Sequence, residues 1–280
     1  MVSRAPQRIV TLTTDFGEQD SYVAQMKGRI LSDFPEAFLV DLSHSIPRHD
    51  IRSAALFLRD GLPAFPSQTI HVVVVDPGVG SSRRGIAVRL AIPGPAGARP
   101  SEQWFVGPDN GLLSSFIAHG SIESAWSLIP EKLSPPLMVS ATFHGRDVFA
   151  PAAARLARGE LPDKFSQRVE NLASLVRLTS LAEPEWDGRT WSGKIIRFDR
   201  FGNAQTNIHS SAAERLSGEI VLTRAACPER PIPRYANYSQ IPDGELGLIV
   251  DSSGYIELAM NQRSAADLLQ LEEAVILRAA

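Results

Sequence analysis

The chain has 280 residues, 44% of them hydrophobic, which is enough for one large domain or two smaller ones. Its formal net charge is -3, and this balance excludes partners that require a strongly basic surface, such as nucleic acids and anionic membranes. A single cysteine, Cys227, excludes an internal disulfide framework.

The N-terminal segment, MVSRAPQRIV, lacks the apolar stretch of a secretory signal peptide. No apolar run in the sequence is long enough to span a bilayer. We therefore expect a cytoplasmic protein with no membrane partner, and one reduced cysteine fits that compartment.

Strands and helices are predicted to alternate through the first half of the chain. Buried strands are expected at 8–13, 37–43, 70–76, 86–91 and 104–107. Helices are expected from Tyr22 to Leu31 and at 51–62, 112–120 and 148–159, the last with Gly159 as its C-terminal cap. This alternation predicts a doubly wound, mostly parallel α/β sheet over residues 1–160.

The pattern changes after residue 160. Residues 161–190 are polar and weakly periodic, which predicts a linker. Residues 191–280 contain short strands with turn signals between them, and one short helical piece at 264–270. We expect a smaller antiparallel β domain here, either a barrel or a sandwich.

Acids, arginines and histidines follow the predicted strands of the first domain. In open α/β sheets ligands bind beyond the carboxyl ends of the strands, so a shared location at this edge indicates a functional site. The residues found there are Asp15, Asp20, Asp41, His44, His49, Asp50, Asp76, Arg83, Arg84, Asp109, Asn110, His144, Arg146 and Asp147.

Each of these residues also has a purely structural interpretation. Asp20 can cap the helix that follows it, and PDNG at 108–111 is an ordinary turn sequence. His144 alone can be a hydrogen-bonded structural histidine, and Arg83 and Arg84 can be a solvated surface pair. Only their common position at one edge of the sheet favours function.

Standard motifs are absent from this edge. GVGSSRRG is not a dinucleotide fingerprint, because Arg83 stands where the third glycine belongs, and neither a P-loop nor a GxSxG elbow occurs. His44 and His49 lie near acids, but they lack the helical i, i+4 spacing of a zinc protease. We expect no metal.

Taken in order, longer segments of the chain resemble a known family. They are LTTDFGEQDSYVAQMKG, DLSHSIPRHD, VVVVDPGVGSSRRGIAV, FVGPDNGLL, TFHGRDVFAPAAARLA, FDRFGNAQTNI and SSGYIELAMNQ. Together they resemble the S-adenosylmethionine hydroxide adenosyltransferases, which are related to bacterial fluorinating and chlorinating enzymes. The resemblance runs from about residue 8 to 275.

This resemblance implies a C-terminal β-barrel and a homotrimer in which S-adenosylmethionine, the substrate, lies between subunits, with no further cofactor. Asp15 would accept hydrogen bonds from both ribose hydroxyls, because a carboxylate has two acceptor oxygens. The other substrate contacts implied are Asp20 to the ammonium group, Asp199 and Ser252 to the amino-acid end, Asn203 with the backbone near Met260 and Gln262 to adenine, and Phe143 and Phe201 to the adenosine.

The resemblance also separates the relatives by their nucleophile. The halogenating enzymes carry Tyr where this chain has Asp76, and the fluorinating enzyme carries Ser where it has Gly145. The hydroxide enzymes carry an Asp, Arg and His triad, which corresponds here to Asp76, Arg83 and His144. A carboxylate repels halide but can orient or deprotonate water, so hydrolysis to adenosine and L-methionine is expected.

Some matters stay open at this point. Tyr22 and Ser253 differ from the residues that hold the methionine carboxylate in the fluorinating enzyme, and His49 replaces an aromatic residue near the sugar. The triad member that takes the proton is not defined. The alternatives are a halide transferase that forms 5′-chloro-5′-deoxyadenosine, a non-catalytic binder of adenosine or S-adenosylmethionine, and a metal hydrolase.

Overall fold

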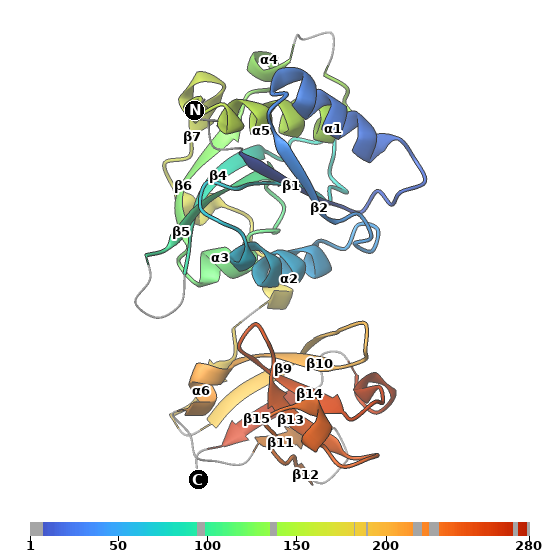
Figure 1. Cartoon of the computed structure of the whole chain (residues 1–280). Coiled ribbons are helices and arrows are strands. Elements are labelled where there is room, and N and C mark those ends of the chain that lie inside the picture. The colour runs from blue at the N-terminus through green and yellow to red at the C-terminus, as the bar shows by residue number, and fades with distance from the viewer. Residues whose placement is uncertain are drawn as a thin grey trace, which may run out of the picture. The chain divides into compact units, whose positions relative to one another are not determined.

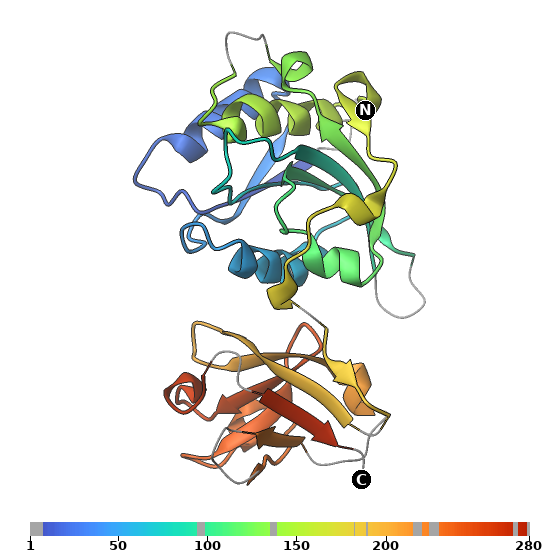
Figure 2. The same cartoon turned by 180° about the vertical axis from the view of Figure 1, so that it is seen from behind.

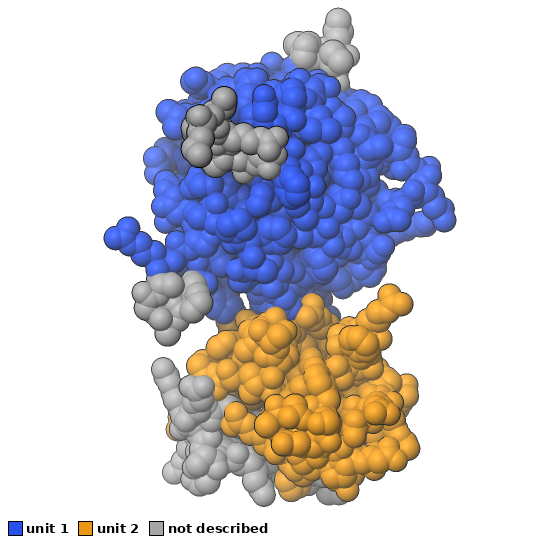
Figure 3. Space-filling view, in the orientation of Figure 1, with its two compact units in different colours: residues 1–180 blue, residues 181–280 orange. Residues whose placement is uncertain are grey.

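The structure is a computed structural model that describes residues 8–93, 99–134, 139–181, 183–188, 190–214, 220–223, 230–270 and 274–278. It divides the chain into two compact units, unit 1 (residues 1–180) and unit 2 (residues 181–280), which are coloured separately in Figure 3. Cys227 lies outside the described residues.

Unit 1 is built on a seven-stranded sheet with the order β2-β1-β3-β5-β4-β6-β7. Strands β1, β2, β3 and β5 are parallel to one another, whereas β4 is antiparallel to both β5 and β6, and β7 is antiparallel to β6. The strands are β1 (Ile9–Thr14), β2 (Phe38–Ser43), β3 (Ile70–Val74), β4 (Gly85–Ile92), β5 (Ser101–Pro108), β6 (Ile122–Leu128) and β7 (Ser166–Arg168).

Helices cover both faces of this sheet, with α1 and α5 on one face and α2 and α3 on the other (Figures 1 and 2). The α-helices are α1 (Tyr22–Asp33), α2 (Ile51–Gly61), α3 (Ser114–Ala118), α4 (Pro130–Leu133) and α5 (Ala150–Ala157). A π-helical turn, η3 (Gly145–Phe149), leads into α5, and short 3₁₀ turns lie at η1 (Leu62–Ala64), η4 (Pro162–Lys164), η5 (Leu172–Ser174) and η6 (Thr179–Leu181). The doubly wound, mostly parallel α/β sheet expected from the sequence is confirmed.

The two-residue period of the strands divides the core between the two faces. Val72 and Val74 pack with Met26 of α1, whereas Val73 packs with Leu58 of α2. The valine run at the centre of the sheet is therefore buried on both sides, as a parallel strand between two helical layers requires. Helix α5 ends as predicted, because Gly159 has a φ of 83° just beyond its last turn.

One polar side chain is accommodated inside this core. His71 is fully buried; Thr11 Oγ1 lies 2.7 Å from its Nδ1, and its Nε2 lies 2.9 Å from Gln103 Oε1. Burial lowers the pKa of His71 to about 4, so the ring is neutral at pH 7. A neutral ring accepts one of these hydrogen bonds and donates the other, which satisfies both nitrogens.

The strand order reverses between β1 and β3. From β1 the chain crosses over through α1 to β2 on one side, and from β2 it returns through α2 to β3 on the other side of β1. Two such neighbouring strands leave a crevice at their carboxyl ends. Asp15 follows β1 and Asp76 lies just beyond β3, so both acids stand at this reversal point.

Part of the segment expected to be a linker, 161–190, has regular structure and packs on unit 1. Strand β7 joins the edge of the sheet, and Leu175 is buried in the core beneath α2 and α3. The buried Asp109 carboxylate accepts the backbone N–H of Val176 at 3.0 Å, and Arg84 donates to the carbonyl of Ser174 at 2.8 Å. Hydrogen bonds to polar groups at the edge of the sheet therefore hold the segment around Ser174 and Val176, although its hydrophobic periodicity is weak.

Unit 2 contains an antiparallel sheet with the order β12-β11-β15-β9-β10-β14-β13, and β8 pairs with β9. Its core includes Ile195, Ile208, Leu248, Ile256 and Leu258. The strands are β8 (Glu185–Trp186), β9 (Thr190–Phe198), β10 (Ala204–His209), β11 (Ile220–Thr223), β12 (Arg230–Pro231), β13 (Leu246–Val250), β14 (Tyr255–Met260) and β15 (Ala274–Arg278). The short helical elements are α6 (Ser210–Glu214), η7 (Tyr238–Gln240) and η8 (Ala265–Asp267).

The antiparallel character of this second domain is confirmed, and closure into a barrel stays a prediction. The described residues show only an isolated bridge from Arg234 to Leu248 near the ends of the strand order, not a ladder between β12 and β13. In the described part of the chain, none of the helices has the length and apolarity needed to cross a membrane.

The ion pair of Asp109 and Arg84 supplies a test of how unit 1 holds the segment around Ser174. The side chain of Asp109 is only 4% exposed, whereas in the pair of Arg89 and Glu102 both side chains are at least 40% exposed. We expect Asp109→Asn to lower the free energy of unfolding by about 2–3 kcal/mol, because a buried charged acceptor is lost. Glu102→Gln, the matched control, should change it by less than about 1 kcal/mol.

Urea denaturation of the full chain, followed by tryptophan fluorescence, measures both variants. Equal, small changes in the two variants would show that the buried pair does not stabilise unit 1. Limited proteolysis gives a second readout, since loss of the Asp109 carboxylate should expose the chain near Val176 to cleavage.

Candidate active site

A cavity of about 250 Å³ opens at the reversal point of the unit 1 sheet. The ends of β1 and β3 contribute one wall, and the segment that precedes η3 contributes another. Its lining residues are Asp15, Phe16, Arg48, His49, Val74, Asp76, Val79, Thr142, Phe143, His144 and Gly145. Five candidate site residues singled out from the sequence therefore share one cavity: Asp15, His49, Asp76, Phe143 and His144.

Asp76 is a buried carboxylate paired with Arg83. Arg83 Nε donates to Asp76 Oδ1 at 2.9 Å, and Arg83 Nη2 donates to Asp76 Oδ2, so the contact is bidentate. The side chains are only 4% and 11% exposed, respectively. Each carboxylate oxygen can accept a further hydrogen bond, because an ionised carboxylate has about four acceptor positions. Asp76 can thus bind a water molecule while it is paired with Arg83.

His144 completes this arrangement from the N-terminal end of η3. Its Nδ1 lies 2.9 Å from the same Nη2 of Arg83 that bonds Asp76. A guanidinium has only donors, so Nδ1 is the acceptor and the proton of the neutral ring is on Nε2. Burial lowers the pKa of His144, and the positive charge of Arg83 lowers it further. The structure therefore brings the predicted triad together with a neutral imidazole.

Two glycines allow close packing around the triad. Gly80 has a φ of 78°, and a Cβ atom there would lie 2.6 Å from the carbonyl oxygen of Ala141. A Cβ atom on Gly145 would lie 3.1 Å from the sulfur of Met26. The loop that carries Arg83 can reach the segment that carries His144 because position 80 has no side chain.

Asp15 is held by the loop that follows β2. Its Oδ2 accepts the backbone N–H of His49 at 2.8 Å, and its side chain is 9% exposed. His49 has a φ of 64°, a left-handed conformation that is uncommon outside glycine, and its imidazole is 73% exposed. The backbone of His49, more than its ring, therefore orients the carboxylate toward the cavity.

Phe143 lies in a cluster of aromatic rings at the edge of the cavity. Its ring makes edge contacts with Tyr22 at 5.2 Å and Phe16 at 6.0 Å between centroids, and the guanidinium of Arg146 lies 5.0 Å from its centre. Arg146 in turn pairs with Asp147 at 2.7 Å. These contacts fix the position of Phe143, the residue before His144.

Two predicted substrate contacts do not line either described cavity. Asp20 is exposed before α1, and the N-cap of that helix is Ser21, so Asp20 is not the cap that the structural interpretation assigned to it. Ser252 is exposed in the turn between β13 and β14. Their proposed roles at the amino-acid end of the substrate stay predictions.

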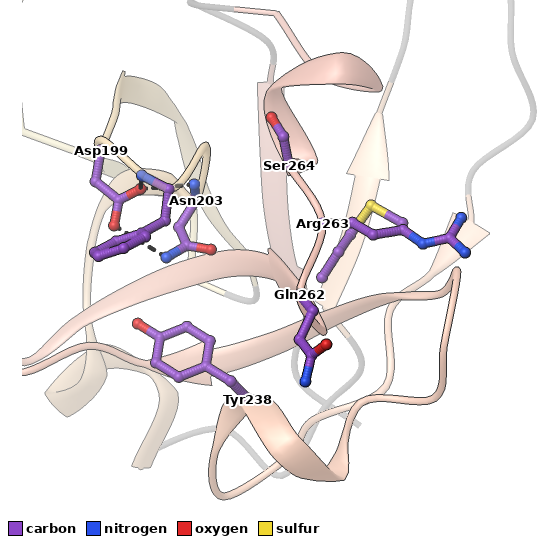
Figure 4. Close-up of a pocket in the computed structure, with 8 residues that line it drawn as sticks. Asp199, Asn203, Tyr238, Gln262, Arg263 and Ser264 are labelled. Carbon is purple, nitrogen blue, oxygen red and sulfur yellow. Dashed lines mark hydrogen bonds between the residues drawn. The ribbon is translucent and has the colours of Figure 1, made fainter.

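A second cavity, of about 550 Å³, lies within unit 2 (Figure 4). It is lined by Asp199, Phe201, Asn203, Tyr238, Met260, Gln262, Arg263 and Ser264. Five of these were predicted from the sequence to bind substrate: Asp199, Phe201, Asn203, Met260 and Gln262. The ring of Phe201 is 77% exposed, which leaves an apolar face available to a ligand.

Asp199 and Asn203 form a closed hydrogen-bonded turn after β9. Asp199 Oδ1 accepts the backbone N–H of Phe201 and of Asn203, each at 2.8 Å, and Oδ2 accepts Asn203 Nδ2 at 2.9 Å (Figure 4). Because the carboxylate requires the NH₂ group, the amide of Asn203 has one orientation only. Oδ1 and the second N–H of Asn203 remain for a ligand.

The structure adds residues that the sequence did not reveal. Tyr238, Arg263 and Ser264 line the cavity of unit 2, and Arg48 lines that of unit 1. Tyr238 lies in PRYANYSQIPDG, where no helix or strand period predicts the direction of a side chain. The one available signal was an aromatic residue within a segment rich in turn formers.

The metal interpretation gains no support from the described residues, among which no group of three or more His, Cys, Asp or Glu side chains is arranged to hold an ion. His44 Nδ1 instead lies 2.9 Å from Thr14 Oγ1, and its Nε2 lies 3.0 Å from Asp41 Oδ1. His44 therefore supports the end of β1.

Comparison with known proteins places both halves of the sequence in one family. The family model of the SAM hydroxide adenosyltransferase N-terminal domain matches residues 10–166, and that of the C-terminal domain matches residues 193–277. A relative named (R)-S-adenosyl-L-methionine hydrolase, from Salinispora arenicola, is 38% identical over 93% of each chain. A fluorinase from Actinopolyspora mzabensis is more distant, at 29% identity over 96% of each chain.

A solved structure shares the whole fold. The crystal structure of an uncharacterized conserved protein from Thermotoga maritima aligns with a TM-score of 0.81 and 28% identity, covering 96% of this chain and 99% of that chain. Both family models match in chain order, and together they cover more than half of the sequence. The chain belongs to the SAM hydroxide adenosyltransferase family.

Proposed function

We propose that the protein hydrolyses S-adenosyl-L-methionine to adenosine and L-methionine. The observation that carries this proposal is the buried Asp76 carboxylate, paired with Arg83 at the wall of the unit 1 cavity. Relatives named (R)-S-adenosyl-L-methionine hydrolase are more similar to this chain than the fluorinase is. A fixed negative charge disfavours a halide nucleophile and favours water.

The reaction breaks the C5′–S bond and forms a C5′–O bond. The electron pair of the broken bond goes to sulfur, which leaves as a neutral thioether and therefore needs no general acid. The water oxygen attacks C5′, and one water proton must be taken up by the enzyme. Because the sulfonium is already a good leaving group, the reaction needs no cofactor.

Asp76 is the residue that we assign as proton acceptor. Nδ1 of His144 is engaged by Arg83, and its Nε2 carries the ring proton, so neutral His144 is a donor on its free side. Arg83 has only donors. Among the three side chains, only Asp76 has unused acceptor positions, so it orients the water and takes its proton.

The remaining contacts are assigned by residue type and position. Oδ2 of Asp15 accepts the backbone N–H of His49 and Oδ1 lies outside that contact, which suits the two hydroxyls of a ribose. Asn203 offers an acceptor and a donor side by side, which suits the edge of adenine. Asp199 orients Asn203 through two hydrogen bonds. In our assignment, a further lone pair of its carboxylate accepts a hydrogen bond from the amino-acid end of the substrate.

We further propose a cytoplasmic homotrimer whose active sites are shared between subunits. The predicted ribose and nucleophile residues line a cavity in unit 1, whereas the predicted adenine residues line a cavity in unit 2. One molecule of S-adenosylmethionine must contact both the ribose and nucleophile residues and the adenine residues. Family resemblance assigns the two sets at one site to different chains.

The main test of the reaction is Asp76→Asn. The amide keeps the shape of the carboxylate but is a much weaker base, so turnover should fall about 10²–10⁴-fold while substrate still binds. Chromatography for adenosine measures the rate, and reaction of the wild type in ¹⁸O-water should place the label on the 5′-oxygen. Hydrolysis by Asp76→Asn at the wild-type rate would contradict the mechanism, and 5′-chloro-5′-deoxyadenosine formed with added chloride would favour the halide alternative.

The protonation state of His144 can be measured directly. Its pKa should rise in Arg83→Gln, because a neighbouring positive charge is removed, and should fall further in Asp76→Asn, because a negative charge is removed. NMR titration of the imidazole resonances, assigned with His144→Gln, gives both values. Shifts in the reverse directions would show that Arg83 does not keep the ring neutral.

The shared site predicts complementation between inactive chains. Asp15→Ala and Asn203→Ala are altered in different units, so each variant alone should lose most activity through weaker binding, by about 2–4 kcal/mol for the lost charged contact of Asp15. After mixed refolding, some interfaces would be wild type at both positions, and activity should reappear. A molar mass from light scattering that corresponds to a monomer, together with full activity of that monomer, would rule out the shared site.

A further inference from the structure

Glu257 is a buried acid that the proposed reaction does not use. It lies on β14, only 5% exposed, with Gln205 of β10 and Ile249 of β13 as its neighbours across the sheet. Burial of a carboxyl group opposes folding unless the group gains compensating hydrogen bonds. The presence of an acid inside the sheet therefore cannot be explained by packing alone.

The partner of Glu257 is a residue of the unit 2 cavity. The hydroxyl of Tyr238 donates to Glu257 Oε1 at 2.9 Å. Tyr238 lies in the short turn η7, its side chain is 43% exposed, and its ring lines the cavity with Asn203 (Figure 4). The ring is thus partly open to a ligand on one side and tied at its hydroxyl to the sheet.

The hydrogen bond to Glu257 restricts a ring that lies on a short surface turn. The N-cap residue, Asn237, makes no side-chain cap hydrogen bond, and η7 is a single turn between Asn237 and Ile241. An aromatic side chain on a short surface turn can rotate about two torsions. A hydrogen bond from its far end to an immobile strand residue removes that freedom before a ligand arrives.

The electrostatic surroundings affect the strength of this anchor near neutral pH. Burial raises the pKa of Glu257 to about 7; the hydrogen bond from Tyr238 lowers it, Asp251 and Asp199 raise it, and Arg197 lowers it. Burial and Glu257 raise the pKa of Tyr238, so its hydroxyl keeps its proton. Ionised Glu257 accepts the stronger, charge-assisted hydrogen bond, whereas protonated Glu257 accepts a weaker one.

We propose that Glu257 is a positioning residue for nucleoside binding, because its carboxyl group holds the ring of Tyr238 as a fixed wall of the unit 2 cavity. This inference rests on the proposed function, since it takes adenosine as the occupant of that cavity. Glu257 acts through Tyr238 and touches no substrate itself. Affinity for adenosine should therefore increase as the pH rises through about 7.

A double-mutant cycle tests this mechanism. The variants are Glu257→Leu, Tyr238→Phe and the two combined, with adenosine affinity measured by calorimetry on the full chain. Each single change should weaken binding about 10-fold through the lost anchor. The combined change should weaken it little more, because both changes remove the same hydrogen bond.

Turnover and pH separate positioning from a merely structural role. The KM for S-adenosylmethionine should rise in each single variant, while kcat at saturating substrate stays near the wild-type value. Glu257→Gln keeps an acceptor for Tyr238 and should lose little affinity at pH 6, but its affinity should not increase between pH 6 and pH 8. Glu245→Gln, which removes an exposed acid of the same unit, is the matched control and should behave as wild type.

The outcomes distinguish this inference from the proposed function. If Glu257→Leu weakens adenosine binding equally in the wild-type and Tyr238→Phe backgrounds, Glu257 does not act through Tyr238. Unchanged affinity in Tyr238→Phe, which keeps the ring and loses only the hydroxyl, would also overturn the inference. If the wild type itself binds neither adenosine nor S-adenosylmethionine, the proposed function fails as well.

Discussion

Two consecutive arginines set the arrangement of this sheet edge. Arg83 pairs with Asp76 beyond β3, and Arg84 pairs with Asp109 beyond β5. Both aspartate side chains are 4% exposed, and a buried carboxylate without a partner would be too costly to keep charged. Because each acid has its own guanidinium, two negative charges can stand near the ends of neighbouring parallel strands.

The two pairs serve different purposes. The pair of Asp76 and Arg83 belongs to the cavity and leaves acceptor positions on the carboxylate. The pair of Asp109 and Arg84 is closed by Ser174 and Val176, so it stabilises the chain that leads out of unit 1. The loop between β3 and β4 therefore carries both Arg83, which pairs with Asp76 at the cavity, and Arg84, which holds the segment around Ser174.

Much of unit 1 could be predicted from sequence because local patterns carry it. The alternation of strand and helix defines the doubly wound sheet, and polar residues after apolar runs mark the carboxyl edge, as Asp15 and Asp76 do. The order of β4 and β5 could not be predicted, since an antiparallel strand inserted beside its successor leaves no local pattern. The direct contact of Arg83 with His144 across 61 positions came from family resemblance and not from spacing.

Long-range contacts explain the other differences. Residues 166–168 pair with β6 as an edge strand, although their sequence is polar and reads as part of a linker. The direction of the Tyr238 side chain depends on its hydrogen bond to Glu257 of β14, and no local sequence pattern predicts that bond. In each case a distant partner, and not the segment itself, determines the structure.

The close approach at Gly80 restricts how this site can change. With a φ of 78° and the carbonyl of Ala141 within 2.6 Å of any Cβ atom, position 80 tolerates no side chain without separating the loop of Arg83 from the segment of His144. A mutational library aimed at a new nucleophile can therefore vary the side chain at position 76 without moving the backbone, whereas a substitution at position 80 displaces the backbone of the site. The capacity of this scaffold to acquire other chemistry is concentrated in the side chains of the triad, and its backbone is the part that cannot be exchanged.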